Sequence, residues 1–116
     1  MIGPGTARLL LALSLLPFLY YAARDQYLHF TARRVSIAEN VLHLFLAVLL
    51  TIVIGRAGLF QPKPAALALL LFVACGAIDE YVFHRGIPEA EHDVHAKEHF
   101  ALLAFVAVFG ALMAMR

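Results

Sequence analysis

The chain has 116 residues, of which 63% are apolar and only 15% are charged. An ordinary soluble domain carries roughly 25% charged residues, which cover its apolar core. Long stretches of this sequence contain no charged residue, so the composition argues against a water-soluble domain and favours a protein surrounded by lipid.

Four blocks without Asp, Glu, Lys or Arg follow one another, at residues 9–23, 40–55, 64–78 and 100–115. A helix of about 15 residues spans about 23 Å, which is less than the roughly 30 Å hydrocarbon layer of a bilayer. Each helix must therefore continue into its polar flanks. We expect a single transmembrane domain, residues 1–116, with helices at about residues 6–30, 36–55, 64–84 and 89–115.

Local signals support these boundaries. Ser36 is a suitable N-cap, with Glu39 three positions later as its capping-box partner. Glycine and proline residues in segments 55–62 and 86–88 predict breaks before the third and fourth helices.

The first apolar run resembles a secretory signal, but Tyr21 lies where a cleavage site prefers a small residue. Cys75 is the only cysteine, so no internal disulfide can form.

Short connections between spanning helices predict an all-α, up-down-up-down four-helix bundle. In that arrangement all eight acidic residues and all six histidines of the chain gather at one membrane face. The only charged residues at the opposite face are then arginine and lysine. Lys and Arg are almost equally numerous on the two faces, so the positive-inside rule does not decide the orientation.

An acidic residue precedes a histidine by four positions on every expected helix. This spacing places both side chains on one helical face, one turn apart, where they can bind the same ion. The pairs are Asp25 with His29, Glu39 with His43, Glu80 with His84, and Glu91 with His95.

The depth of these residues makes metal binding the favoured interpretation. His43 and His99 lie about two turns inside their helices, where an unpaired charge facing lipid costs several kcal/mol. On the fourth helix, His92, His95 and His99 follow the spacing of a single face. The candidate ligands are too many for one tetrahedral zinc and suit two metal ions bridged by carboxylate. The candidate ligands are Glu39, His43, Glu80, His84, Glu91, His92, His95, Glu98 and His99.

Other interpretations stay open for individual residues. The acids and histidines could form a solvated rim at the membrane surface. Asp25, Glu89 and Asp93 fit solvated positions or partners of a helix dipole. His29 lies next to a loop and stays undecided, and Asp79 could orient a histidine that binds the metal.

The spacings Glu39-x-x-x-His43 and Glu80-x-x-x-His84, with the His92, His95 and His99 cluster, resemble the motifs of integral-membrane non-haem di-iron enzymes. Ferritin-like di-iron proteins share the four-helix layout but use Glu-x-x-His, which is one residue shorter. This chain also has no His-x-x-His-His motif. The resemblance implies an oxidoreductase with two iron ions that acts on a lipid or another lipophilic molecule; zinc, manganese or copper accept the same ligands.

Three other functions remain possible at this stage. The chain could bind metal without catalysis, bind haem between His43 and His99, or serve as an accessory subunit of a larger membrane complex. Small residues such as Gly76 and Gly110 could allow homo-oligomers. We expect the bilayer to be a bacterial cytoplasmic membrane, and we expect no nucleic-acid partner.

Overall fold

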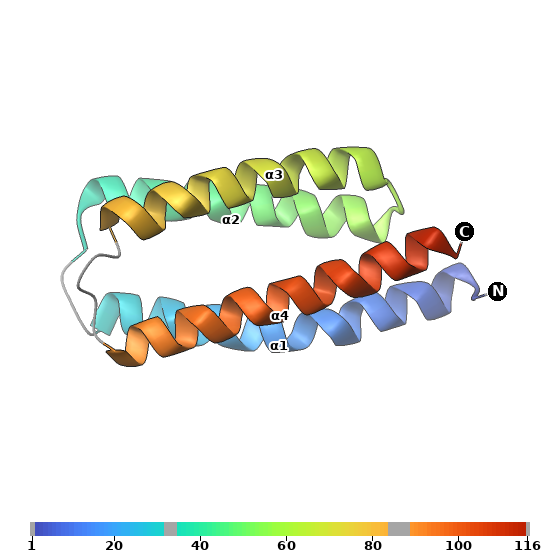
Figure 1. Cartoon of the computed structure of the whole chain (residues 1–116), viewed down its shortest axis with the longest axis horizontal. Helices are drawn as coiled ribbons and strands as arrows, with labels where there is room; N and C mark the ends of the chain where they lie inside the picture. Colours follow the sequence, from blue (N-terminus) through green and yellow to red (C-terminus); the bar gives the residue numbers. More distant parts are fainter. Residues whose placement is uncertain (1, 32–34, 84–88, 116) are drawn as a thin grey trace. The chain divides into compact units, whose positions relative to one another are not determined.

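The computed structural model describes residues 2–31, 35–83 and 89–115, and this part of the chain contains helices and no strand (Figure 1). The elements in chain order are α1 (Pro4–Thr31), α2 (Ile37–Gly58), α3 (Pro62–Ile78), the π-helical turn η1 (Asp79–Phe83) and α4 (Glu89–Ala114). Four helical segments are long and apolar enough to cross a membrane. They are α1, α2, α4, and α3 extended through η1 to Val82. The prediction of four such helices is confirmed.

The start of α2 lies where the sequence predicted it, whereas its end does not. Ser36 is the N-cap, and its Oγ accepts a hydrogen bond of 3.1 Å from the Glu39 N–H. The helix ends later than predicted, because it continues through Gly55 to Gly58. Phe60, with a φ of 56°, ends it, and Gln61 N–H donates to the Arg56 carbonyl in the manner of a Schellman motif.

The end of the third predicted helix also differs from the expectation. Regular α-helix stops at Ile78, and the next five residues form η1. A π turn is rare, appears mostly as a single turn at an α-helix, and occurs frequently at functional sites. No simple spacing rule in the sequence indicates such a turn. His84, where we expected this helix to end, lies outside the described residues.

The chain divides into two compact units. One contains α1 and α4, and the other contains α2, α3 and η1. Within each unit the two long helices lie side by side and run antiparallel (Figure 1). The units are described separately below.

A regular seam joins α1 and α4. On α4 the buried residues Val94, Ala101, Phe105 and Leu112 recur at intervals of four or seven positions, as in a coiled coil. The same intervals continue toward the start of the helix through Glu98 to Glu91, so these acids face α1. The apolar seam residues of α1 are Ala7, Leu11 and Phe18.

The seam between α2 and α3 combines the buried Leu49 and Val53 of α2 with several alanines. Ala57, Ala65 and Ala68 are buried, and small side chains allow the two backbones to approach closely. At the other end of this pair, the buried seam positions are acidic: Glu39 on α2 and Asp79 in η1. Both helix pairs therefore have an apolar seam that ends in ionisable residues.

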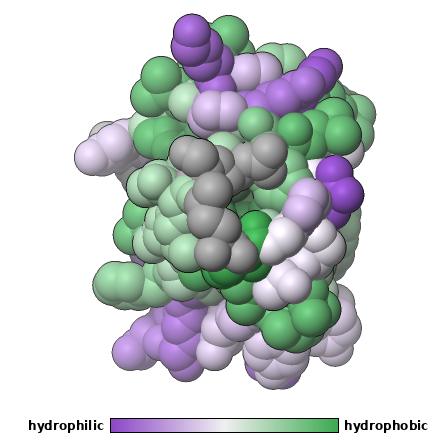
Figure 2. Space-filling view, turned by 90° about the vertical axis from the view of Figure 1, so that its right-hand side faces the viewer, coloured by the Kyte–Doolittle hydropathy of each residue, from purple (hydrophilic) through white to green (hydrophobic). Residues whose placement is uncertain are grey.

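Each of the four helices carries exposed apolar side chains. Leu13, Leu44, Leu70 and Leu103 are examples of large side chains that are more than half exposed. Figure 2 shows apolar side chains over much of the surface in that view, with hydrophilic side chains in a few patches. Such a surface is typical of helices that cross a bilayer.

Candidate metal sites

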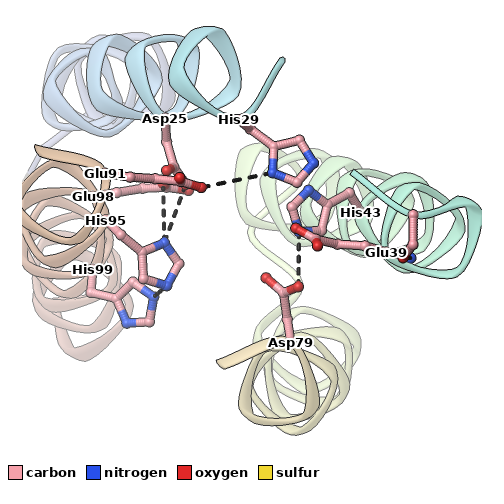
Figure 3. Close-up of polar contacts among 10 residues, drawn as sticks. Asp25, His29, Glu39, His43, Asp79, Glu91, His95, Glu98 and His99 are labelled. Carbon is pink, nitrogen blue, oxygen red and sulfur yellow. Dashed lines mark hydrogen bonds and ion pairs between the residues drawn. The ribbon is translucent and has the colours of Figure 1, made fainter. Parts of the chain in front are cut away.

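Four ionisable residues meet between α1 and α4. We call them the Asp25 cluster: Asp25 from α1, and His95, Glu98 and His99 from α4 (Figure 3). His95 Nδ1 lies 3.2 Å from Asp25 Oδ2 and 3.9 Å from Glu98 Oε2. On the other side of the same ring, His95 Nε2 lies 3.1 Å from His99 Nε2.

The antiparallel register of the two helices explains this meeting. Asp25 and His29 are one turn apart on α1, and Glu91 and His95 are one turn apart on α4. Because the helices run in opposite directions, each acid lies opposite a histidine of the partner helix. Asp25 therefore meets His95, and His29 meets Glu91.

The Asp25 cluster has the donors of a metal site. Asp25, His95 and Glu98 each offer one ligand atom, and these atoms all lie within 4.8 Å of one another. Metal–ligand bonds of about 2.0–2.2 Å bring ligand atoms to about 3–4 Å from one another, so modest side-chain movement is sufficient. Two carboxylates and a neutral imidazole balance the charge of a divalent ion.

His99 completes the cluster without being one of these three ligands. When His95 Nδ1 binds a metal ion, the remaining proton of that ring resides on Nε2 and can be donated to His99 Nε2. A partner of this kind fixes the tautomer and the orientation of a metal-binding histidine. His99 is placed to act as such a partner if the cluster holds an ion.

His29 and Glu91 form a second polar contact between α1 and α4. His29 Nδ1 lies 3.9 Å from Glu91 Oε1, and the two side chains are only 2% and 1% exposed. Figure 3 shows the His29 ring directed toward the Glu91 carboxylate. The structure thus places the predicted ligand Glu91 beside His29, the residue that the sequence left undecided.

A second cluster lies between α2 and η1. We call it the His43 cluster: Glu39, His43 and Asp79. His43 Nε2 lies 2.9 Å from Asp79 Oδ1 and 3.9 Å from Glu39 Oε2, which is one turn before it on α2. Both carboxylate residues are buried, with 3% exposure each.

The remaining candidates lie elsewhere. Glu80 follows Asp79 in η1 and is half-buried, and His84 is outside the described residues. His92 is exposed on α4, and the structure shows no polar contact between it and another described residue. Asp93 is exposed and forms a 2.8 Å ion pair with Lys97, which agrees with the solvated position considered for it.

Sequence reasoning set aside two residues that the structure places at the centre of the clusters. Asp25 was considered a solvated acid, although its four-residue spacing to His29 mirrors that of Glu91 to His95. Matching these two pairs in antiparallel register would have found it. Asp79 was considered an orienting partner of a histidine, and its hydrogen bond to His43 is compatible with that role.

Comparisons of the chain with protein-family models, with curated proteins and with solved structures found no match. A function for the chain must therefore be inferred from the geometry of its own polar clusters.

Proposed function

We propose that the chain is an integral-membrane metalloprotein that binds a divalent metal ion in the Asp25 cluster. Its four helices cross the bilayer in alternating directions as a bundle, and we expect that bilayer to be a bacterial cytoplasmic membrane. The protein ligands are Asp25, His95 and Glu98, and His99 orients His95. The single observation that carries this proposal is the gathering of three ligand atoms from two helices within 4.8 Å.

The surroundings of the Asp25 cluster favour an ion over an empty polar contact. Two carboxylates on facing helices repel each other, and their desolvation in a bilayer adds to the cost. A divalent ion offsets both effects, because it carries two positive charges and binds both carboxylates. The one nitrogen and two oxygen ligands suit iron, manganese or zinc, and the absence of thiolate donors argues against soft-metal chemistry.

The resemblance to membrane di-iron enzymes extends the proposal to iron and to oxidoreductase chemistry. With three protein ligands, an ion in the Asp25 cluster keeps coordination positions for solvent or substrate. Iron bound in this way supplies redox chemistry, and the lipid-facing helices give a lipophilic substrate access from the bilayer. The ligand count predicted two ions per chain, and this proposal assigns one of them to the Asp25 cluster.

Metal analysis of the purified protein tests the proposal. The protein is produced in cells supplied with iron, manganese and zinc, purified in detergent, and its metal content is measured by mass spectrometry. We expect His95→Ala to lower the metal content by about one ion per chain, because it removes the only nitrogen ligand of the cluster. Optical and Mössbauer spectroscopy then test whether the native ion is iron.

His92→Ala is the matched control. His92 is a histidine on the same helix, one turn from His95, but it is exposed and lies outside the cluster. Its replacement should leave the metal content unchanged. A metal-free protein from metal-supplied cells, or equal losses in the two variants, would contradict the proposed site.

A further inference from the structure

We infer that the His43 cluster is a second binding site for a divalent metal ion, with Glu39, His43 and Asp79 as its ligands. This site lies entirely within the pair formed by α2 and α3 with η1. It does not depend on the proposed site in the Asp25 cluster, because the two share no residue.

The carboxylate contacts of the His43 ring repeat those of the His95 ring. In each, one imidazole nitrogen has a carboxylate oxygen at hydrogen-bond distance and a second carboxylate oxygen at 3.9 Å. The close oxygen is 2.9 Å from His43 Nε2 and 3.2 Å from His95 Nδ1. In each, the ligands come from two antiparallel helices. Two helix pairs that share no residue therefore present the same set of one nitrogen and two oxygen donors.

Charge and burial identify the class of ligand. Glu39 and Asp79 are almost completely buried, and a single proton on His43 would leave the cluster with a net negative charge. A divalent cation with a neutral imidazole brings the net charge to zero, which is the least costly state in a low-dielectric environment. A nitrogen and two carboxylates suit iron, manganese or zinc better than calcium or magnesium, which prefer oxygen ligands alone.

The backbone on both sides of the cluster fixes the ligand positions. The Ser36 N-cap accepts a hydrogen bond from the Glu39 N–H, so the first turn of α2 is held in place. Asp79 begins the π turn η1, at the point where α3 departs from regular helix. A rigid cap and a local π turn are both compatible with a preorganised site.

The roles of Asp79 and Glu80 distinguish this inference from a ligand set read from sequence spacing. Spacing alone selects Glu80, whereas the hydrogen bond to His43 selects Asp79. The two acids are adjacent in the same π turn, so substitutions at these positions form a matched pair. Asp79→Asn and Glu80→Gln each remove one negative charge with little change in shape.

The experiment measures binding of Mn²⁺ and Zn²⁺ to detergent-purified, metal-stripped protein by equilibrium dialysis. We expect the parent protein to bind about two ions per chain and Asp79→Asn to bind about one, while Glu80→Gln still binds about two. Thermal unfolding and circular dichroism of each variant establish that it is folded. A folded Asp79→Asn protein with unchanged binding would overturn the inference, and so would an equal loss in the two variants.

His95→Ala, alone and combined with Asp79→Asn, separates the two sites. His95→Ala removes the nitrogen ligand of the Asp25 cluster, so the single variant should still bind one ion, in the His43 cluster. The double variant should lose that ion as well. If His95→Ala loses nothing while Asp79→Asn loses one ion, the proposed site fails and the second site stands. If Asp79→Asn loses nothing while His95→Ala loses one ion, the inference fails and the proposed site stands.

Discussion

Carboxylates lie beside imidazoles at three places in the described chain: Asp25 and Glu98 at His95, Glu91 at His29, and Glu39 and Asp79 at His43. An isolated charge at such a position is costly in lipid, whereas a charge with a partner of opposite sign is tolerated. Single residues at these places therefore affect both stability and binding. Asp93 and Lys97 form an exposed ion pair, for which we expect little effect on stability or binding.

The buried pair of His29 and Glu91 should be energetically coupled. We expect His29→Gln and Glu91→Gln to destabilise the protein individually, because each leaves a buried polar group without its charged partner. The double variant should lose less than the sum of the two, with a coupling of about 0.5–3 kcal/mol. Reversible unfolding in detergent measures the three differences.

The control for this cycle is the surface pair on the same helix. Asp93→Asn and Lys97→Gln disrupt an exposed pair, for which we expect no measurable coupling. Additive effects of the two substitutions at His29 and Glu91 would show that the buried pair is not an interacting unit.

At the scale of the helix, the decisive property is which face is directed at the partner helix. Glu91 and Glu98 lie on the α4 seam with Phe105 and Leu112, seven positions apart, whereas the predicted His92 stripe lies one position away from it. One position rotates a side chain by about 100° around the helix axis. That rotation is sufficient to leave His92 exposed while Glu91 is buried.

Phe105 and Leu103 test this assignment of faces. Phe105 is 2% exposed, and Leu103 is 64% exposed. When a buried side chain is truncated in lipid, little transfer energy is lost, but a cavity remains and packing contacts disappear. We expect Phe105→Ala to lower the free energy of unfolding by roughly 2 kcal/mol. This is less than the cost of about 3–5 kcal/mol for the same substitution in the core of a soluble protein.

Leu103→Ala is the comparison for the exposed side of α4, and its effect should lie within about 0.5 kcal/mol of zero. Unfolding in detergent micelles provides both measurements. A larger effect at Leu103 than at Phe105 would mean that the opposite face of α4 packs against protein.

At the scale of the whole molecule, the four helices are long and apolar enough to cross a membrane, and if all four cross it, both chain ends lie on the same side. The structure agrees within the α1–α4 unit, where the start of α1 and the end of α4 lie at the same end of the pair (Figure 1). The start of α2 should then be on the opposite side, since the chain crosses the bilayer once before reaching it.

Cysteine labelling measures this topology in membrane vesicles. In a Cys75→Ser background, we expect Gly3→Cys and Met115→Cys to react with a membrane-impermeant maleimide from the same side. Ile37→Cys, at the start of α2, should react only from the other side. Labelling of the two chain ends from opposite sides would be incompatible with four spans.

The sequence by itself was sufficient for the four helices, their polar ends and the Ser36 cap, because charge-free length and local capping chemistry need no tertiary information. It also identified His43, His95 and their neighbouring acids as candidates. The structure decided that Asp25 and Asp79, rather than His92, accompany these histidines. The physical reason is that lipid and protein interior are equally apolar, so hydropathy does not distinguish the lipid-facing side of a spanning helix from its packed side. Only the antiparallel pairing of α1 with α4 and of α2 with α3 determined which ionisable side chains meet.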